Sequence, residues 1–123
     1  MLTKKQINHA QNILRRASYR APGCIKAMNA AKKYVKVHNK DGSVSKKKHV
    51  RYQCAHCNNW FSRKQVQRDH IDPVIDPAEG FVNLEKYYVR LFVDEDRWQI
   101  LCKDCHNKKT RSENKIRQKR GRK

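Results

Sequence analysis

Four cysteines in two matched pairs are the residues of this 123-residue chain best suited to hold a metal ion. Each pair has two residues between its members, in Cys54-Ala-His-Cys57 and Cys102-Lys-Asp-Cys105. A Cys-x2-Cys knuckle presents two thiolates, and four thiolates complete the tetrahedral shell of Zn²⁺. Such a shell has no open position for a substrate. We therefore expect a structural zinc ion that joins two segments separated by 44 residues.

Other uses of the cysteines and their neighbours remain open at this point. The two pairs could be buried thiols that arose by chance, without a metal. The fifth cysteine, Cys24, is expected to be a small buried residue rather than a ligand. His56 lies inside the first knuckle and is expected to contact solvent or DNA.

Three residues close to the cysteines carry a second kind of chemistry. Asp69-His70 ends a predicted strand after the first knuckle, and His106 directly follows the last cysteine. A zinc ion that joins the knuckles would let His106 face Asp69 and His70. A carboxylate and two imidazoles suit phosphodiester hydrolysis, with a divalent ion on the phosphate and a neutral imidazole that takes a proton from water. The alternative is that Asp69 only supports a structural His70.

The combined motif resembles the zinc-containing HNH endonucleases, and small bacteriophage members in particular. The resemblance covers about residues 51–112 and rests on the first knuckle, on residues 67–73 (QRDHIDP) and on residues 99–110 (QILCKDCHNKKT). It implies a ββα-metal (HNH/His-Me finger) core: two antiparallel strands and a helix around one catalytic ion. It further implies that His70 is the general base, that Asp69 and His106 hold a catalytic Mg²⁺ or Mn²⁺, and that the four cysteines hold the structural Zn²⁺.

The sequence departs from the family pattern at Arg97. This residue stands where the family has an asparagine that orients the general base through hydrogen bonds. The Arg97 guanidinium could take over that role, or it could bind a phosphate.

Charge is unevenly distributed along the chain. Lys and Arg number 30 against 11 Asp and Glu, for a net charge of +19 and a pI near 10.1. The net charge is +16 over residues 1–68, −3 over residues 69–113 and +6 over residues 114–123. Such an excess of cations calls for an anionic partner, most commonly nucleic acid. The acidic middle fits a cation site, although an exposed acidic helix is the simpler explanation.

Lysine and arginine side chains that contact the phosphate backbone of DNA increase the affinity and make it dependent on salt, but they contribute little to sequence specificity. The cations expected to contact DNA are Lys4, Lys5, Arg15, Arg16, Lys46, Lys47, Lys48, Lys108, Lys109 and Arg111. Trp60 and Trp98 are expected to pack in the core, with base stacking as the alternative.

Hydrophobic periodicity predicts an α+β fold that positions these residues. Helices are expected over residues 3–18, 25–33 and 81–92 and from residue 103, and strands over 34–37, 49–53, 66–71 and 98–101, with a turn at 39–43. We divide the chain into a basic helical and hairpin DNA-binding extension (1–50), the HNH nuclease domain with its zinc (51–112) and a basic, disordered tail (113–123). No run approaches the roughly 20 apolar residues of a membrane span, so we expect a soluble, cytoplasmic protein.

The residues and the resemblance together predict a metal-dependent endonuclease that nicks or cuts double-stranded DNA, leaves 5′-phosphate and 3′-hydroxyl ends, and serves as a phage or homing nuclease. Whether it is a monomer or a homodimer stays open. The alternative is a catalytically weakened, zinc-stabilised nucleic-acid-binding protein in which Arg97 has disabled the site. A ribosome-associated RNA-binding zinc protein would explain the charge and the zinc, but not Asp69, His70 and His106 together.

Overall fold

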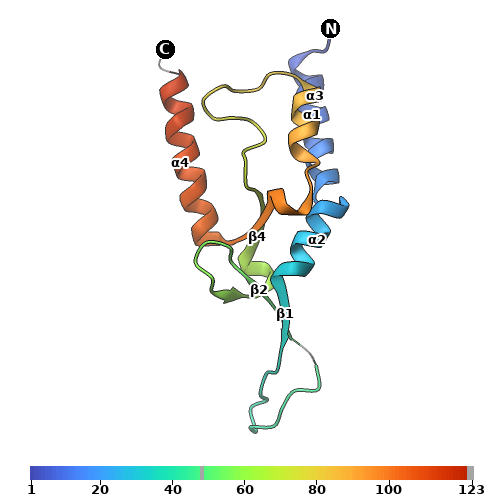
Figure 1. The fold of residues 1–123 in the computed structure, drawn as a ribbon, viewed down its shortest axis with the longest axis vertical. Coiled ribbons are helices and arrows are strands. Elements are labelled where there is room, and N and C mark those ends of the chain that lie inside the picture. Colours follow the sequence, from blue (N-terminus) through green and yellow to red (C-terminus); the bar gives the residue numbers. More distant parts are fainter. Residues whose placement is uncertain (48, 122–123) are drawn as a thin grey trace.

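Figure 1 shows the computed structural model of the chain, which describes residues 1–47 and 49–121. This part of the chain forms a small α+β fold, as predicted, with four α-helices and two small antiparallel sheets. The elements in chain order are α1 (Lys4–Ser18), α2 (Pro22–Ala31), β1 (Lys32–Val35), β2 (His49–Gln53), β3 (Trp60–Phe61), β4 (Val66–His70), α3 (Leu84–Leu91), β5 (Trp98–Cys102) and α4 (Lys103–Gly121). Short 3-10 helices, η1 (Arg63–Gln65) and η2 (Glu95–Arg97), precede β4 and β5.

The sheet of β4 and β5 carries the predicted chemistry. The two strands pair antiparallel, with Asp69 opposite Gln99 and His70 opposite Trp98, and β5 runs directly into α4. Because successive side chains of a strand point to opposite faces, Asp69 and His70 leave β4 on different sides. The predicted strands 66–71 and 98–101 and the helix from residue 103 are therefore confirmed as a two-stranded sheet followed by a helix.

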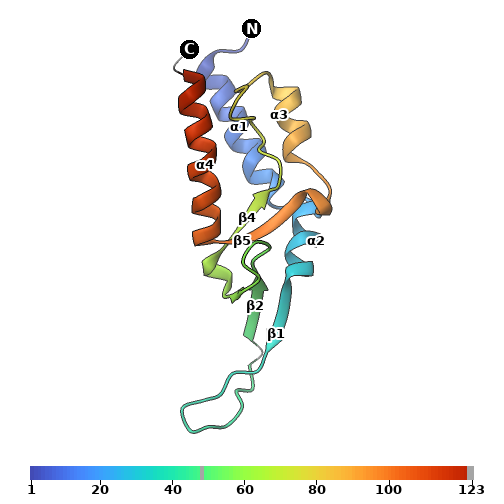
Figure 2. The same ribbon diagram turned by 60° about the vertical axis from the view of Figure 1, so that its left-hand side comes forward.

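The second sheet contains the predicted hairpin and one strand that the sequence did not reveal. The first strand of the hairpin, β1, begins and ends two residues earlier than the predicted 34–37. β1 pairs antiparallel with β2, with Lys32 opposite Tyr52, and the turn at 39–43 closes through the Asn39 N–H to the Ser43 carbonyl at 2.7 Å. β3, which was not predicted, adds to the other edge of β2. The hairpin and its loop project from the body at the end opposite both termini (Figures 1 and 2).

Helix α1 begins at a capping box and packs on the middle of the chain. The Thr3 hydroxyl accepts from the Gln6 N–H at 3.2 Å, while the Gln6 side chain accepts from the Thr3 N–H at 2.8 Å. Leu14 packs against the buried cluster formed by Val74, Tyr87 and Leu91. The N-terminal segment thus shares a core with residues 74–91, although the sequence assigned it to a separate extension.

Helix α4 differs most from its prediction. The basic tail over 113–123 was expected to be disordered, but residues 113–121 continue α4, and residues 122–123 lie outside the described part. Glu113 lies between cations one turn away on each side, 3.6 Å from the Lys109 Nζ and 3.8 Å from an Arg117 Nη. Arg120 donates to the Pro77 carbonyl at 3.1 Å. These contacts compensate part of the positive charge of α4 and attach its inner face to the body.

None of the described helices combines the length and the apolar composition needed to cross a membrane.

Candidate metal and catalytic site

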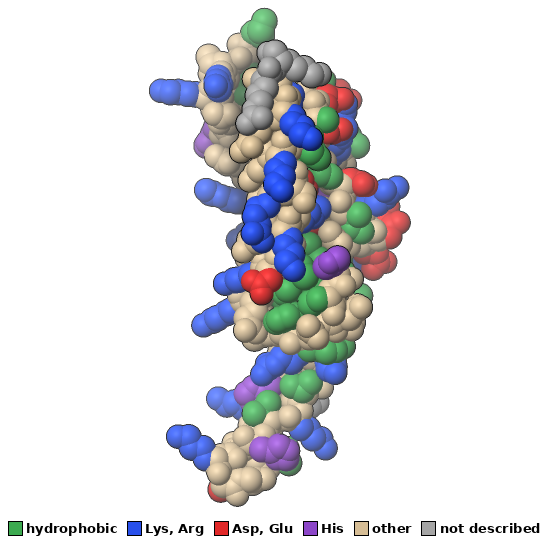
Figure 3. Space-filling model, turned by 90° about the vertical axis from the view of Figure 1, so that its left-hand side faces the viewer, with side chains coloured by type: hydrophobic (Ala, Val, Ile, Leu, Met, Phe, Trp, Pro, Cys, Tyr) green, Lys and Arg blue, Asp and Glu red, His purple; other side chains and the backbone are tan. Residues whose placement is uncertain are grey.

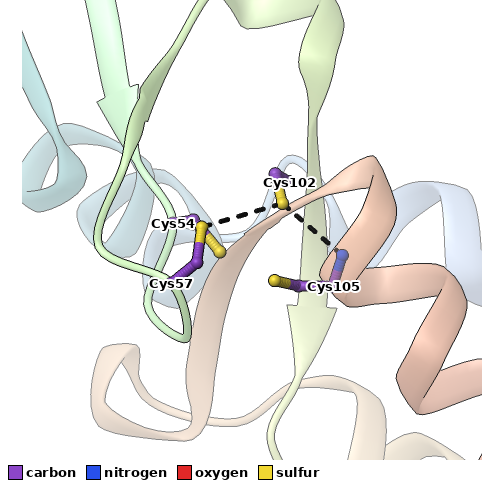
Figure 4. Close-up of side chains that lie close together, drawn as sticks. All are labelled: Cys54, Cys57, Cys102 and Cys105. Carbon is purple, nitrogen blue, oxygen red and sulfur yellow. Dashed lines mark hydrogen bonds between the residues drawn. The ribbon is translucent and has the colours of Figure 1, made fainter.

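The four paired cysteines meet in one cluster, as the sequence predicted (Figure 4). Cys54 and Cys57 come from the loop after β2, Cys102 ends β5, and Cys105 lies in the first turn of α4. Their sulfur atoms lie within 4.8 Å of one another, and the Sγ atoms of Cys57 and Cys102 are 4.0 Å apart. Zinc–sulfur bonds of about 2.3 Å place the sulfurs of a tetrahedral site roughly 3.8 Å apart. The cluster can therefore hold a metal ion such as zinc.

The backbone holds the two knuckles against each other. The Ala55 N–H donates to the Ile100 carbonyl at 2.8 Å, which attaches the first knuckle to β5. The Cys105 N–H donates to the Cys102 Sγ at 3.5 Å within the second knuckle. Asn58 closes the first knuckle with a φ of 63°, a left-handed conformation that asparagine tolerates better than most residues.

The thiols do not ionise alike. Burial raises the pKa of Cys54, but backbone N–H donors in the two knuckles outweigh burial and lower it to about 6. The hydrogen bond to Cys102, followed by burial, raises the pKa of Cys105 to about 12. One thiolate is thus available near neutral pH, while the last proton is held tightly until a cation compensates the negative charge. Binding of a metal ion should accordingly release protons.

Asp69 lies at the centre of the second predicted constellation. Its Oδ1 is 3.7 Å from the His106 Nε2, so α4 does bring these two residues together. Its Oδ2 accepts from the Lys109 Nζ at 2.6 Å and from the Gln99 side chain at 2.9 Å. A small divalent ion places neighbouring ligands roughly 3 Å apart and opposite ligands roughly 4 Å apart. The Oδ1 and Nε2 positions are therefore close enough to share one ion, while Lys109 and Gln99 hold the other oxygen.

His70 is buried on the other side of the strand, at 6% exposure. Its Nε2 lies 2.9 Å from the Leu91 carbonyl, and its ring centroid lies 3.9 Å from that of the buried Trp98. A carbonyl oxygen only accepts hydrogen bonds, so Nε2 carries the ring proton and Nδ1 is the basic nitrogen. Burial is the main reason why the pKa of His70 lies below its usual value, so the ring is neutral at pH 7.

A cavity of about 230 Å³ connects these residues. Asp69, His70 and His106 line it together with cations from two helices, Arg15 of α1 and Arg117 of α4. Helices α1 and α4 both contribute residues to the lining of this cavity, and both helices extend beyond the end of β4 (Figure 2). The sequence did not indicate Arg117 or the acidic Glu113, which also lines the cavity, because both lie in the segment predicted to be disordered.

Arg97 takes a position different from the one that the motif suggested. Its side chain is exposed and pairs with Asp72 at 3.0 Å, and its backbone carbonyl accepts from the Ile71 N–H at 2.9 Å. The loop after β4 is thus held by the Arg97 backbone, whereas His70 is held by Leu91 and Trp98. Trp98, which the sequence placed either in the core or against bases, is 4% exposed and packs.

The cations predicted to contact DNA fall on several surfaces. Lys4, Lys5 and Arg16 are exposed on α1, Lys46 and Lys47 are exposed in the loop of the hairpin, and Lys48 lies outside the described residues. Lys108 and Arg111 belong to an exposed row that follows the outer face of α4 (Figure 3), with Lys115 and Lys119 further along. This row points away from the face that carries His106. Lys109, by contrast, is engaged by Asp69 and by the His70 carbonyl at 2.6 Å.

No protein-family model, no curated protein and no solved structure matches this chain. The chemistry of the site is therefore inferred from its own residues.

Proposed function

We propose that this protein is a metal-dependent DNA endonuclease of the HNH type, with a structural zinc ion in the four-cysteine cluster. The observation that carries the proposal is the approach of His106 to Asp69 in a cavity that His70 and two arginines also line. A nucleic-acid-binding module that only needed zinc and cations would have no use for this group of residues. The net charge of +19 supports an anionic polymer as the substrate.

His70 is the general base of the proposed reaction. Its neutral ring and the free Nδ1 allow it to take a proton from a water molecule. The resulting hydroxide attacks phosphorus and the bond from phosphorus to O3′ breaks. The departing O3′ takes a proton from water, so that a 3′-hydroxyl and a 5′-phosphate remain. Leu91 and Trp98 hold the ring in place during this step, which is the task of the motif asparagine that Arg97 replaces.

Asp69 and His106 are the proposed ligands of a catalytic Mg²⁺ or Mn²⁺. When bound, this ion would neutralise the phosphate and stabilise the departing O3′. Lys109 and Gln99 bind the Oδ2 atom of Asp69 and leave Oδ1 directed to His106. His106 is itself 32% exposed in its side chain, so a phosphate in the cavity can approach this position.

One contact favours a second function, a zinc-stabilised DNA-binding protein without activity. The Lys109 ammonium lies 2.6 Å from Asp69 and neutralises the carboxylate that would otherwise attract a divalent ion. In this alternative the pair of Asp69 and Lys109 only attaches α4 to β4. The zinc cluster and the basic surfaces would serve both functions equally.

The experiment that decides between the two functions is cleavage of supercoiled plasmid by the purified protein in Mg²⁺ or Mn²⁺, with buffer that contains neither ion as the negative control. We expect open circles or linear DNA with the wild type, and at least a hundredfold slower conversion with His70→Asn and His106→Ala. His9→Ala, at an exposed position of α1, is the matched histidine control and should cut at the wild-type rate. Circular dichroism and zinc content check that each variant is folded.

Two outcomes would contradict the proposal. Ion-dependent cleavage that survives both His70→Asn and His106→Ala would show that the activity lies elsewhere or in a contaminant. Binding of DNA without cleavage by the wild type, under every ion tested, would favour the inactive binding protein. If the wild type does not cut DNA but the variant Arg97→Asn does, Arg97 is the residue that silences the site.

A further inference from the structure

Arg15 lies where the N-terminal helix meets the cavity of the proposed catalytic centre. It lines the same cavity as Asp69, His70 and His106, although it precedes them by more than fifty residues. Along α1, Arg15 lies one residue after Leu14, which packs into the core. Arg15 therefore lies at the edge of the helix face that packs against the body. The next residue, Arg16, is turned by a further 100° and does not line this cavity.

The side chain of Arg15 is held in place by α3. Its Nε donates to the Tyr87 hydroxyl at 3.3 Å, and that hydroxyl donates to the Gln11 carbonyl at 3.4 Å. Tyr87 is 4% exposed and belongs to the buried cluster beneath α1. A flexible arginine is thereby tethered by a rigid neighbour, while the residue as a whole stays accessible to solvent.

Arg15 also differs from the other cations of the cavity in its charge balance. Lys109 pairs with Asp69 and Glu113, and Arg117 pairs with Glu113. Among the described residues, no carboxylate lies within ion-pair distance of Arg15. A tethered, accessible guanidinium without a counter-ion, in a cavity beside a candidate hydrolytic group, is suited to bind a phosphate.

We propose that Arg15 binds the phosphate group of DNA at the catalytic centre, and that Tyr87 is the positioning residue that orients it. The inference rests on the proposed nuclease function and deepens it. Helix α1 then completes the site instead of acting as a separate DNA-binding extension. Arg15 supplies the positive charge that Lys109 and Arg117 cannot, because their charges are compensated within the protein.

The chemistry explains why such a contact would act on the rate as well as on binding. Negative charge on the non-bridging phosphate oxygens has to be stabilised while hydroxide attacks and O3′ leaves. A guanidinium donates two parallel hydrogen bonds to a phosphate and is placed before the reaction, so little reorganisation is needed. Lysine in the same place would keep the charge but lose both the pair of parallel hydrogen-bond donors and the hydrogen bond to Tyr87.

The test compares Arg15→Ala, Arg15→Lys and Tyr87→Phe with the matched control Arg20→Ala. Arg20 carries the same charge, is exposed in the turn after α1 and lines none of the cavities described. Cleavage of supercoiled plasmid is measured in Mn²⁺ with the protein in excess, and binding of a 30-base-pair duplex is measured without Mg²⁺ or Mn²⁺ at several salt concentrations.

We expect Arg15→Ala to slow cleavage of bound plasmid about 10- to 100-fold, whereas Arg20→Ala stays within about twofold of the wild type. Arg15→Lys should recover part of the rate, and Tyr87→Phe should lose about three- to tenfold with little loss of duplex binding. A purely structural role of Arg15 would predict equal losses in Arg15→Ala and Arg15→Lys, because both lose the bond to Tyr87. Equal rates for Arg15→Ala and Arg20→Ala would overturn the inference.

A separate readout keeps the inference testable if the wild type does not cut DNA and the proposed function fails. The ¹⁵N resonance of the Arg15 Nε–H group, identified by its loss in Arg15→Lys, is followed while the duplex is added without Mg²⁺ or Mn²⁺. A shift larger than that of Arg20 would support the phosphate contact in a binding protein. Equal or absent shifts would overturn it.

Discussion

Substitution of Cys57 by serine tests the four-cysteine cluster as a clamp on the whole fold. Eleven hydrophobic residues are buried among those described, and three of them, Cys54, Cys102 and Cys105, belong to the cluster itself. The remaining core is small for a chain of this length. The contact between Cys57 and Cys102 closes a loop across a separation of 45 residues. A cross-link over such a loop removes unfolded-state entropy equivalent to roughly 4 kcal/mol.

This loss is comparable to the total stability of a typical domain, about 5–15 kcal/mol. We therefore expect Cys57→Ser to lower the unfolding free energy by about 4 kcal/mol, and removal of the metal by a strong chelator to do the same in the wild type. Urea unfolding followed by circular dichroism gives the free energy, and zinc content after dialysis gives the occupancy, which should be near one per chain in the wild type.

Cys24→Ala is the matched control, because Cys24 is buried but lies outside the cluster. It should retain the zinc content of the wild type and lose only about 1 kcal/mol. A Cys57→Ser protein that keeps its zinc through dialysis against a chelator, and unfolds at the same urea concentration as the wild type, would refute the idea of a metal clamp.

Three further predictions concern the body of the protein. Leu91 is fully buried, so Leu91→Ala should lower the unfolding free energy by about 2–5 kcal/mol in urea titrations, and a loss under 1 kcal/mol would speak against this core. A Cβ on Gly23 would clash with the Val93 carbonyl oxygen, so Gly23→Ala should lower the unfolding free energy by about 1–3 kcal/mol, and an unchanged urea midpoint would contradict that close approach. Because burial lowers the pKa of His70 from 6.5, the unfolded chain binds a proton more readily than the folded chain, and the unfolding free energy should fall as the pH drops below about 6.5. This dependence of the unfolding free energy on pH should be weaker in His70→Asn. An identical dependence in the variant would exclude His70 as its source.

The secondary structure near the motifs was predictable because its signals are local. The capping threonine and the apolar spacing of residues 3–18 indicate α1, and the turn residues 39–43 indicate the hairpin. The matched Cys-x2-Cys spacing indicates the metal cluster, because a knuckle presents its two sulfurs whatever the rest of the chain does.

Other features escaped prediction because they depend on partners far away in the chain. β3 has only two residues and exists because β2 offers an unpaired edge. The end of α4 is polar and basic and resembles a disordered tail, but Arg120 donates to the Pro77 carbonyl once α4 lies against the body. The Pro77 carbonyl lies outside residues 113–121, so the pattern of these residues does not reveal it.

The sequence alone determined which chemical groups the protein possesses: four soft thiols at ligand spacing, an Asp-His pair, a histidine next to the last thiol, and a large excess of cations. Only the tertiary structure decided how those groups are used. It pairs Lys109 with Asp69 across 40 residues and tethers Arg15 to Tyr87 across 72. The physical reason is that the identity of a side chain sets its charge and its hydrogen-bond donors. Whether that charge is paired depends on which distant groups the packing of α1, α3 and α4 brings within hydrogen-bond distance.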